Sequence, residues 1–181
     1  MDAKALALNN QLIHWFQQKH QLQCCNTPSV ESARYLGLLV NNLLLPIEEN
    51  LGEISISYGF VGPELNRYIQ RHSPVGTAPL LDQHACCEVN SKGKAISQRP
   101  GAACDFFVLG FEDKMHEVVL FICQHLVFDK LYFYGRNRPI HLSVSESPLR
   151  HLQVMQHNKN GRRYPGEKAF SDNALALAKE L

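Results

Sequence analysis

Apolar side chains recur at helical spacing in the first quarter of the chain. The first stripe predicts an amphipathic helix over residues 3–20, with Leu6, Leu8, Leu12, Ile13 and Phe16 as its apolar positions. The second stripe predicts the main core helix and contains Tyr35, Leu36, Leu39, Val40, Leu43 and Leu44. Thr27 and Pro28 are typical of a helix start, as N-cap and first-turn proline, and Pro46 is expected to end or kink the helix.

Helix and strand patterns alternate in the rest of the chain. Strands are predicted over residues 54–58, 102–109, 130–134, 139–145 and 151–156, the third and fourth of which form a hairpin. Helices are predicted over residues 62–72, 113–126 and 171–181, the last with Ser171 as its cap. Residues 73–100 and 158–166 are rich in turn residues and predict loops, the first long enough to be functional or disordered. Helices followed by strands predict an α+β fold with a small antiparallel sheet and N-terminal helices.

Composition and charge narrow the classes of partner. The chain has 181 residues, 45% of them hydrophobic, so a single domain over residues 1–181 with a sizeable core is expected. The formal net charge of +1 disfavours nucleic acid and anionic membrane surfaces as partners. Residues 36–47 are interrupted by Asn41, Asn42 and Pro46, so no membrane span is predicted. Residues 1–11 lack the pattern of a secretion signal, and a cytoplasmic location is expected.

The six cysteines do not form a metal-binding pattern. Cys24 and Cys25 are adjacent, as are Cys86 and Cys87, and no Cys-x-x-Cys motif occurs. Thiolate zinc sites need ligand pairs separated by two to four residues, which vicinal cysteines do not supply. Most of the cysteines are therefore interpreted as small buried hydrophobic residues in a reducing cytosol.

Three polar residues in or near apolar segments are candidate metal ligands. Asp105 interrupts one apolar strand, His141 interrupts another, and His84 stands in the long loop. A buried carboxylate needs a cation, a metal or a tight set of donors, because an unpaired buried charge is costly. Two imidazoles and one carboxylate, with a fourth position open to water, are typical of a catalytic zinc site. The alternative interpretations are a salt-bridged Asp105, a hydrogen-bonded strand histidine and a solvated loop histidine.

The order of the motifs resembles the zinc peptidases of the M15 family, in particular their small cell-wall endopeptidases and D,D- or L,D-carboxypeptidases, whose fold is similar to the hedgehog signalling domain. Family members have an apolar helix ending near a proline, a strand ending in Ser-Gly-Tyr-Arg-Ser, a Leu-Asn helix, a Ser-x-His-x-x-Gly-x-Ala-x-Asp element and a late strand with a final histidine. The counterparts here are residues 43–47, 54–59, 63–67, 101–106 and 139–143. The resemblance implies a divergent member with a core over about residues 27–146, a C-terminal extension over residues 147–181, and zinc held by His84, Asp105 and His141.

The chain departs from the family pattern at three positions. Gln98 stands where the family's first histidine is expected, so either an insertion keeps His84 at the metal or Gln98 takes that place and the site is inactive. The arginine expected after Ser-Gly-Tyr corresponds to Phe60 or Val61, which argues against an ordinary peptidoglycan stem peptide as substrate. Arg138 aligns with the family's general base, and an arginine does not accept a proton at physiological pH.

Other residues take the remaining roles in this interpretation. Glu88 follows His84 by four residues and is the candidate general base, with an exposed loop acid as the alternative; Glu146 is a second choice. Ser57, Tyr58 and Arg138 are the candidate substrate-binding residues. The alternative is that Tyr58, like Tyr132 and Tyr134, is a half-buried packing residue, and that Arg138, like Arg67 and Arg136, is a solvated surface charge.

Two functions follow from these features. The first is a zinc hydrolase that cleaves an amide or peptide bond with a metal-activated water. The second is a catalytically inactive domain of the same fold that binds a protein partner through residues 73–100. The metal of this second candidate is structural or absent. Loss of zinc in His84→Ala would support the alignment that keeps His84 at the metal, and unchanged zinc content would contradict that alignment.

Overall fold

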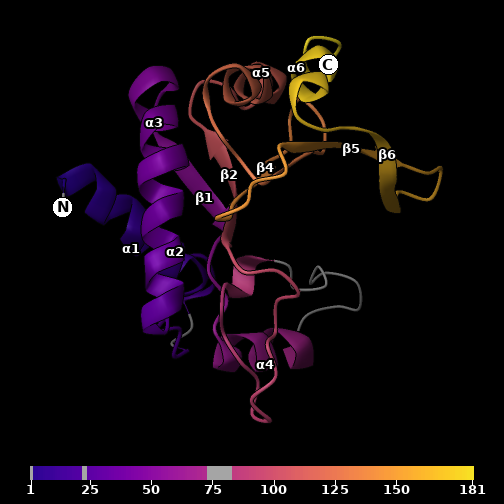
Figure 1. Ribbon diagram of the computed structural model, residues 1–181. Coiled ribbons are helices and arrows are strands. Elements are labelled where there is room, and N and C mark those ends of the chain that lie inside the picture. Colours follow the sequence, from indigo (N-terminus) through magenta and orange to yellow (C-terminus); the bar gives the residue numbers. More distant parts are fainter. Residues whose placement is uncertain (1, 22–23, 73–82) are drawn as a thin grey trace.

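The computed structural model describes residues 2–21, 24–72 and 83–181 (Figure 1). The helices are α1 Ala3–His20, α2 Val30–Leu39, the π-helix η1 Val40–Leu44, α3 Leu45–Leu51, α4 Pro63–His72, the 3-10 helix η2 Gln83–Ala85, α5 Met115–His125 and α6 Asp172–Ala178. The predicted helices over residues 3–20, 62–72, 113–126 and 171–181 are confirmed to within a few residues. The first ten residues of the predicted loop over residues 73–100 lie outside the described residues.

Six strands form one sheet in the order β1-β2-β4-β3-β5-β6. They are β1 Ile54–Tyr58, β2 Ala102–Val108, β3 Lys130–Phe133, β4 Ile140–Val144, β5 His151–His157 and β6 Arg163–Ala169. Neighbours are antiparallel except β3 and β5, which are parallel. The α+β class and the hairpin of β3 with β4 are confirmed. The predicted sheet was too small, because β6 lies partly in the segment 158–166 that was predicted as a turn.

The C-terminal residues belong to the same sheet and core. β5 and β6 extend the sheet, and Figure 1 shows α6 beside α5 at the end of the molecule opposite α4. Leu152, Ala174 and Leu177 are buried in the main hydrophobic cluster. Residues 147–181 therefore complete the fold instead of forming an appendage to it. Among the described residues, no helix combines the length and the apolar character that a membrane crossing requires.

The helix around Pro46 continues where an end or a kink was predicted. α2 passes directly into the π-helix η1 and then into α3, with Pro46 in the first turn of α3. Proline lacks an amide donor and clashes with the carbonyl four residues earlier, and the wider π turn just before it accommodates both effects. Capping also differs from the prediction. Ser29 instead of Thr27 caps α2, and Ser171 makes no side-chain cap to α6.

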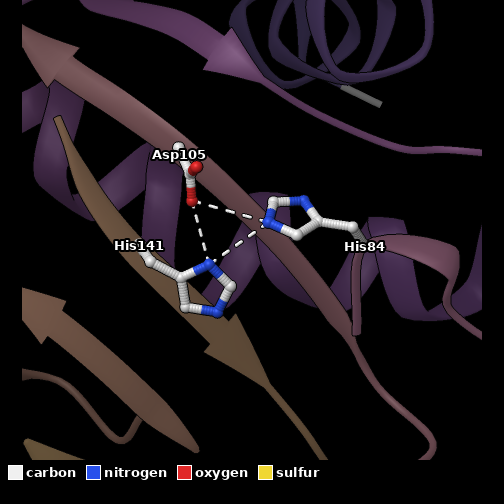
Figure 2. Close-up of side chains that lie close together, drawn as sticks. All are labelled: His84, Asp105 and His141. Carbon is white, nitrogen blue, oxygen red and sulfur yellow. Dashed lines mark hydrogen bonds and ion pairs between the residues drawn. The ribbon is translucent and has the colours of Figure 1, made fainter. Parts of the chain in front are cut away.

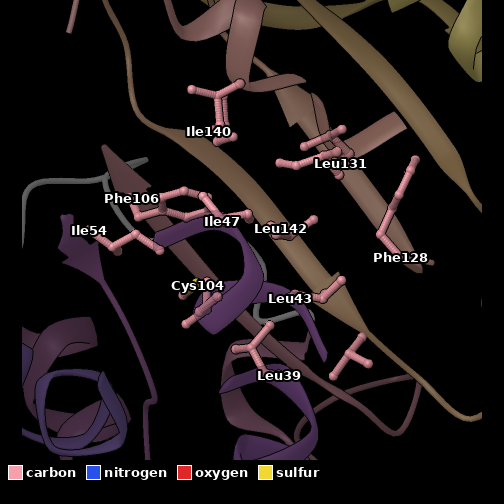
Figure 3. Close-up of a cluster of buried hydrophobic side chains, with 14 of the residues drawn as sticks. Leu39, Leu43, Ile47, Ile54, Cys104, Phe106, Phe128, Leu131, Ile140 and Leu142 are labelled. Carbon is pink, nitrogen blue, oxygen red and sulfur yellow. The ribbon is translucent and has the colours of Figure 1, made fainter. Parts of the chain in front are cut away.

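Successive side chains of a strand point to opposite faces of the sheet, so the main core lies on one face and Asp105 on the other. Figure 3 shows Cys104 and Phe106 of β2 together with Ile140 and Leu142 of β4 in the buried cluster that packs under α2 and α3. Because successive residues of a strand point to opposite faces, the positions between these belong to the other face of the sheet. Asp105 lies between Cys104 and Phe106, so this carboxylate faces away from the main core.

Candidate metal centre

His84, Asp105 and His141 come together on the face of the sheet opposite the main core (Figure 2). Asp105 on β2 and His141 on β4 are directly paired in the register of the two antiparallel strands. Directly opposed residues share a face of a sheet, which places the two side chains side by side. The short helix η2 adds His84 from a segment distant in sequence. One nitrogen or oxygen from each residue lies within 4.8 Å of the other two.

The distances between these atoms fit a metal site. His141 Nδ1 is 2.9 Å from Asp105 Oδ1, His84 Nε2 is 3.2 Å from His141 Nδ1, and His84 Nε2 is 3.5 Å from Asp105 Oδ1. Bonds of about 2.0–2.1 Å to a tetrahedral zinc ion would place neighbouring ligand atoms about 3.3 Å apart. The 3.2 and 3.5 Å separations lie close to that value, and the 2.9 Å separation between His141 Nδ1 and Asp105 Oδ1 is that of a hydrogen bond. The donor set, two imidazoles and a carboxylate, is also one that zinc prefers.

The ring of His84 is oriented by the backbone of the segment that follows β1. Its Nδ1 is 3.1 Å from the Gly59 carbonyl oxygen, and its own carbonyl accepts a hydrogen bond from the Val61 amide over 3.0 Å. A carbonyl oxygen only accepts, so Nδ1 carries the proton and Nε2 presents its lone pair to the centre. Such a contact to the second ring nitrogen is typical of metal-binding histidines.

The segment that carries His84 is also anchored to Asp129, the residue just before β3. Gln83 donates from Nε2 to Asp129 Oδ2 over 2.8 Å. Arg99 donates to both oxygens of the fully buried Asp129, over 2.9 and 3.0 Å, and the Leu149 amide donates to Oδ1. Burial alone would raise the pKa of Asp129, but these hydrogen bonds outweigh it and lower the pKa below its ordinary value. The loop from Gln83 to Arg99 is thus tied to the sheet at both ends.

Asp105 is held in its ionised form. Burial alone would raise the pKa of its carboxyl group, but the hydrogen bond from His141 Nδ1 and the adjacent His84 ring outweigh burial and lower the pKa well below the ordinary range. The carboxylate is therefore the charged, acceptor-only form that binds a cation. The interpretation of Asp105 as the partner of an arginine does not apply, since histidines are its neighbours. The ring of Tyr132 stacks on His141 at 4.8 Å between centroids, which fixes the plane of that ligand.

His84 and Gln98 lie in different surroundings. His84 is 1% exposed and lies at the centre, so the solvated-loop interpretation of His84 is wrong. The side chain of Gln98 is exposed. His84, and not Gln98, therefore lies beside Asp105.

Glu88 lies outside the group of three. Its side chain is only 8% exposed, so the interpretation as an exposed loop acid is wrong. One carboxylate oxygen accepts a 2.8 Å hydrogen bond from the Ser29 amide at the start of α2. Glu146, the second choice for a base, is paired with Arg34 over 2.9 Å. A base role for Glu88 stays a prediction, beside an observed role in holding the loop to α2.

The three residues predicted to contact substrate lie along one cleft beside Asp105. Ser57, Tyr58 and Arg138 all line this cleft of about 550 Å³. Ser57 also donates from Oγ to the Asp105 backbone carbonyl over 3.1 Å, and the Tyr58 ring meets the His84 ring edge-on. The three residues therefore lie on the same side of the sheet edge as Asp105, and their contact with a substrate stays a prediction.

Sequence reasoning missed the residues that support the ligands. Asp129 interrupts an apolar segment as Asp105 does, and the same signal applied there would have found it. Gly59 acts through its backbone carbonyl, which leaves no mark in a pattern of side chains. Trp15 of α1 lines the cleft, but as one apolar position of an amphipathic helix it carried no separate signal.

Comparisons with known proteins found no relative of this chain. No protein-family model matches the chain, and searches of curated proteins and of solved structures found no significant match.

Proposed function

We propose that the chain is a zinc-dependent hydrolase that cleaves an amide or peptide bond. His84, Asp105 and His141 are its metal ligands. The observation that carries the proposal is the set of three separations, 2.9, 3.2 and 3.5 Å, among atoms from three distant segments. The resemblance to M15 zinc peptidases supplies the reaction class, and with it an M15-like or hedgehog-like fold.

In this proposal, each of the three residues binds zinc through a defined atom. His84 binds through Nε2, because its Nδ1 proton is committed to the Gly59 carbonyl. His141 binds through Nδ1 and Asp105 through Oδ1, the atoms that face His84 Nε2. Three protein ligands leave a fourth tetrahedral position, as in catalytic sites. A zinc ion bound there lowers the pKa of a water ligand to about 7 and polarises a carbonyl group.

The cleft beside Asp105 presents the substrate to this centre. Tyr58 lies against His84 and also lines the cleft, so the scissile amide is placed between the cleft and the ligands. The Trp15 ring packs on the Tyr58 ring at 4.3 Å between centroids, and the two rings form one side of the cleft.

The second candidate function is a binding module of the same fold. It is favoured by the hydrogen bond that engages Glu88 with the Ser29 amide, because a carboxylate committed to a backbone amide is a poorer proton acceptor. In that case the three ligands hold a structural metal or none.

The first experiment measures zinc in protein purified without added metal or chelator, by elemental analysis. The expected result is about one zinc per chain, lost in His84→Ala and retained in the control His125→Ala, an exposed histidine on α5. Replacing zinc by cobalt should give the visible spectrum of a tetrahedral site. Absence of zinc even after reconstitution, or zinc that is unchanged in His84→Ala, would overturn the proposal and favour the binding module.

A further inference from the structure

The hairpin formed by β5 and β6 concentrates basic side chains at one edge of the molecule. Figure 1 shows its turn extending outward, away from α1 to α4. Residues 157–168 hold one of the chain's 17 acidic residues, Glu167, and four of its 18 basic residues, Lys159, Arg162, Arg163 and Lys168. The net charge of +1 therefore averages a basic hairpin with a slightly acidic remainder. A net charge that disfavours nucleic acid for the chain as a whole does not describe this hairpin.

The turn of the hairpin leaves two of these cations available to a ligand. Asn158 Oδ1 accepts hydrogen bonds from the Asn160 and Arg162 amides over 3.0 and 2.9 Å, so backbone groups and one asparagine shape the turn. The side chains of Lys159 and Arg162 take no part in these bonds and are exposed. Among the described residues, neither cation belongs to an ion pair. A ligand therefore displaces no internal partner when it binds them.

The other two cations, Arg163 and Lys168, lie on one face of the hairpin. In the register of β5 and β6, Arg163 is opposite His157 and Lys168 is opposite Gln153. His157 and Gln153 are an even number of positions apart on β5, so they and their opposed partners share a face. The Arg163 guanidinium lies over the Tyr134 ring, 4.9 Å from its centroid, which holds the arginine along this face. The turn and this face form one basic surface, the hairpin patch, made of Lys159, Arg162, Arg163 and Lys168.

The chemistry of the hairpin patch suits a ligand with regularly repeated negative charges. Lysine and arginine side chains are donors without an acceptor, and they are the groups that most often contact phosphate oxygens of nucleic acids. A two-stranded β-ribbon also has a width that the major groove of B-form DNA admits. The major groove of duplex RNA is too deep and narrow for side chains to reach into it. Duplex DNA therefore matches both the charge and the shape of the hairpin.

Single-stranded nucleic acid fits this surface less well. Proteins bind single strands with aromatic rings on which successive bases stack. Here Arg163 covers the Tyr134 ring, and the Phe170 ring stacks on His151 at 4.4 Å between centroids. These rings are engaged within the protein, and Tyr164 is the single phenyl-type ring of residues 151–169. One exposed ring does not make a platform for several bases.

We propose that the hairpin patch binds duplex DNA through its phosphates, with the turn lying in the major groove. Lys159 and Arg162 contact phosphates beside the turn, and Arg163 and Lys168 contact phosphates along one strand. Because phosphate contacts carry no sequence information, binding is independent of base sequence. The patch shares no residue with the candidate metal centre, so the inference goes beyond the proposed hydrolase and does not rest on it.

Salt dependence tests the phosphate contacts. Fluorescence anisotropy of a labelled DNA duplex of about 20 base pairs is measured while full-length protein is added at about 50 mM salt, with EDTA so that bound metal contributes no charge. The expected result is micromolar affinity. The logarithm of the association constant should fall against the logarithm of the salt concentration with a slope of about −3 to −4, for about four phosphate contacts. Absence of saturable binding, or an affinity unchanged between about 50 and 200 mM salt, would overturn the inference.

Two double variants separate the hairpin patch from net charge. Lys159→Gln with Arg162→Gln is expected to weaken binding about tenfold or more and to make the salt slope shallower by about two. The matched control, Lys92→Gln with Lys94→Gln, changes the net charge equally. It alters exposed lysines on a turn of the same construction, in which Asn90 Oδ1 accepts hydrogen bonds from both lysine amides over 2.9 and 3.1 Å.

The control variant should change the affinity by less than about twofold, because its lysines lie outside the patch and salt screens distant charges. Circular dichroism verifies that both variants are folded. Equal weakening by the two variants would show an effect of net charge alone and would overturn the inference.

Two competitors test the class of ligand. Unlabelled single-stranded DNA of the same length and poly-glutamate of about 20 residues are both expected to displace the labelled duplex less well than unlabelled duplex does. Poly-glutamate that competes as well as the duplex would overturn the proposal in favour of an acidic protein segment. Single-stranded DNA that competes as well would overturn it in favour of a single-strand surface. The zinc content enters none of these measurements, so this inference and the proposed hydrolase fail separately.

Discussion

Gln83 donates a 2.8 Å hydrogen bond to the buried carboxylate of Asp129, and the next residue in the chain is the candidate ligand His84. The same carboxylate accepts two hydrogen bonds from Arg99, where the loop returns to the sheet. A metal ligand on a loop is precise only when the loop is itself held, because small displacements spoil the coordination geometry. Asp129 is thus the positioning residue for His84, although it does not contact the centre.

Replacing Asp129 tests this positioning role. Asp129→Asn removes the charge that pairs with Arg99 and is expected to lower the free energy of unfolding by about 2–4 kcal/mol, since it breaks a largely buried ion pair. It should also weaken zinc binding, because the anchor of Gln83 is lost. Urea denaturation and zinc titration measure the two effects. Asp113→Asn, an exposed aspartate before α5, is the control and should change stability by less than about 0.5 kcal/mol. Wild-type zinc affinity in Asp129→Asn would contradict the positioning role.

The lowered pKa of Asp129 also predicts a pH dependence of stability. An acid whose pKa is lower in the folded state stabilises the protein fully above its unfolded pKa, about 3.9, and loses that contribution as the pH falls through the folded value. The difference in stability between wild type and Asp129→Asn should therefore be constant near neutral pH and shrink below about pH 4. Urea midpoints at pH 7, 5 and 3 measure it. A difference that grows on acidification would show that the sign is wrong.

The candidate ligands could be predicted from sequence because two of them break an apolar pattern. Asp105 and His141 each stand in a strand of otherwise apolar residues, and pairing of the two strands brings them together. His84 has no such mark: it was chosen as a histidine in the long loop, and the resemblance placed Gln98 at the expected position. Local pattern therefore found the strand ligands, whereas the place of the loop histidine depends on tertiary contacts.

The parts that sequence reasoning missed depend on tertiary contacts. β6 contains Pro165 and Gly166, both poor strand residues, and it forms because it pairs with β5 at the edge of the sheet. The helix past Pro46 persists because a π turn relieves the proline, a feature without a sequence pattern of its own. The same holds for the backbone carbonyl of Gly59, whose role appears only when His84 lies beside it.

Gly59 offers a test of how α1 supports the centre. A Cβ at this position would lie 2.4 Å from the Leu12 backbone oxygen and 2.8 Å from Trp15 Cδ1, so Gly59→Ala must push the segment away from α1. This shift moves the carbonyl that orients His84. We expect a loss of stability of about 1–3 kcal/mol and weaker zinc binding.

Gly37→Ala is the matched control for Gly59→Ala. Gly37 lies inside α2 with nothing within 4 Å of an added Cβ, so Gly37→Ala should stabilise the helix by about 0.5–1 kcal/mol and leave zinc binding unchanged. Thermal unfolding and zinc titration of both variants give the comparison. If Gly59→Ala were as stable as Gly37→Ala, the close approach of α1 to this segment would be refuted.

Glu88 has two proposed roles that make opposite predictions for one substitution. As an anchor it accepts a hydrogen bond from the Ser29 amide, and a glutamine amide oxygen accepts the same bond. Glu88→Gln is therefore expected to keep the fold and the zinc stoichiometry, with a loss of about 1 kcal/mol or less, whereas Glu88→Ala should lose about 1–2 kcal/mol because the amide of Ser29 is left without this acceptor.

A general base at this position would behave differently. Glutamine does not take up a proton, so Glu88→Gln would lower the rate of hydrolysis by a factor of about 10²–10⁴ while zinc and stability stayed unchanged. The bond to Ser29 occupies one carboxylate oxygen and fixes the side chain toward α2. On that geometry we expect the glutamine variant to retain most of the activity of the wild type toward an amide substrate. A rate loss of a hundredfold in a folded, zinc-containing Glu88→Gln protein would instead assign the proton transfer to Glu88.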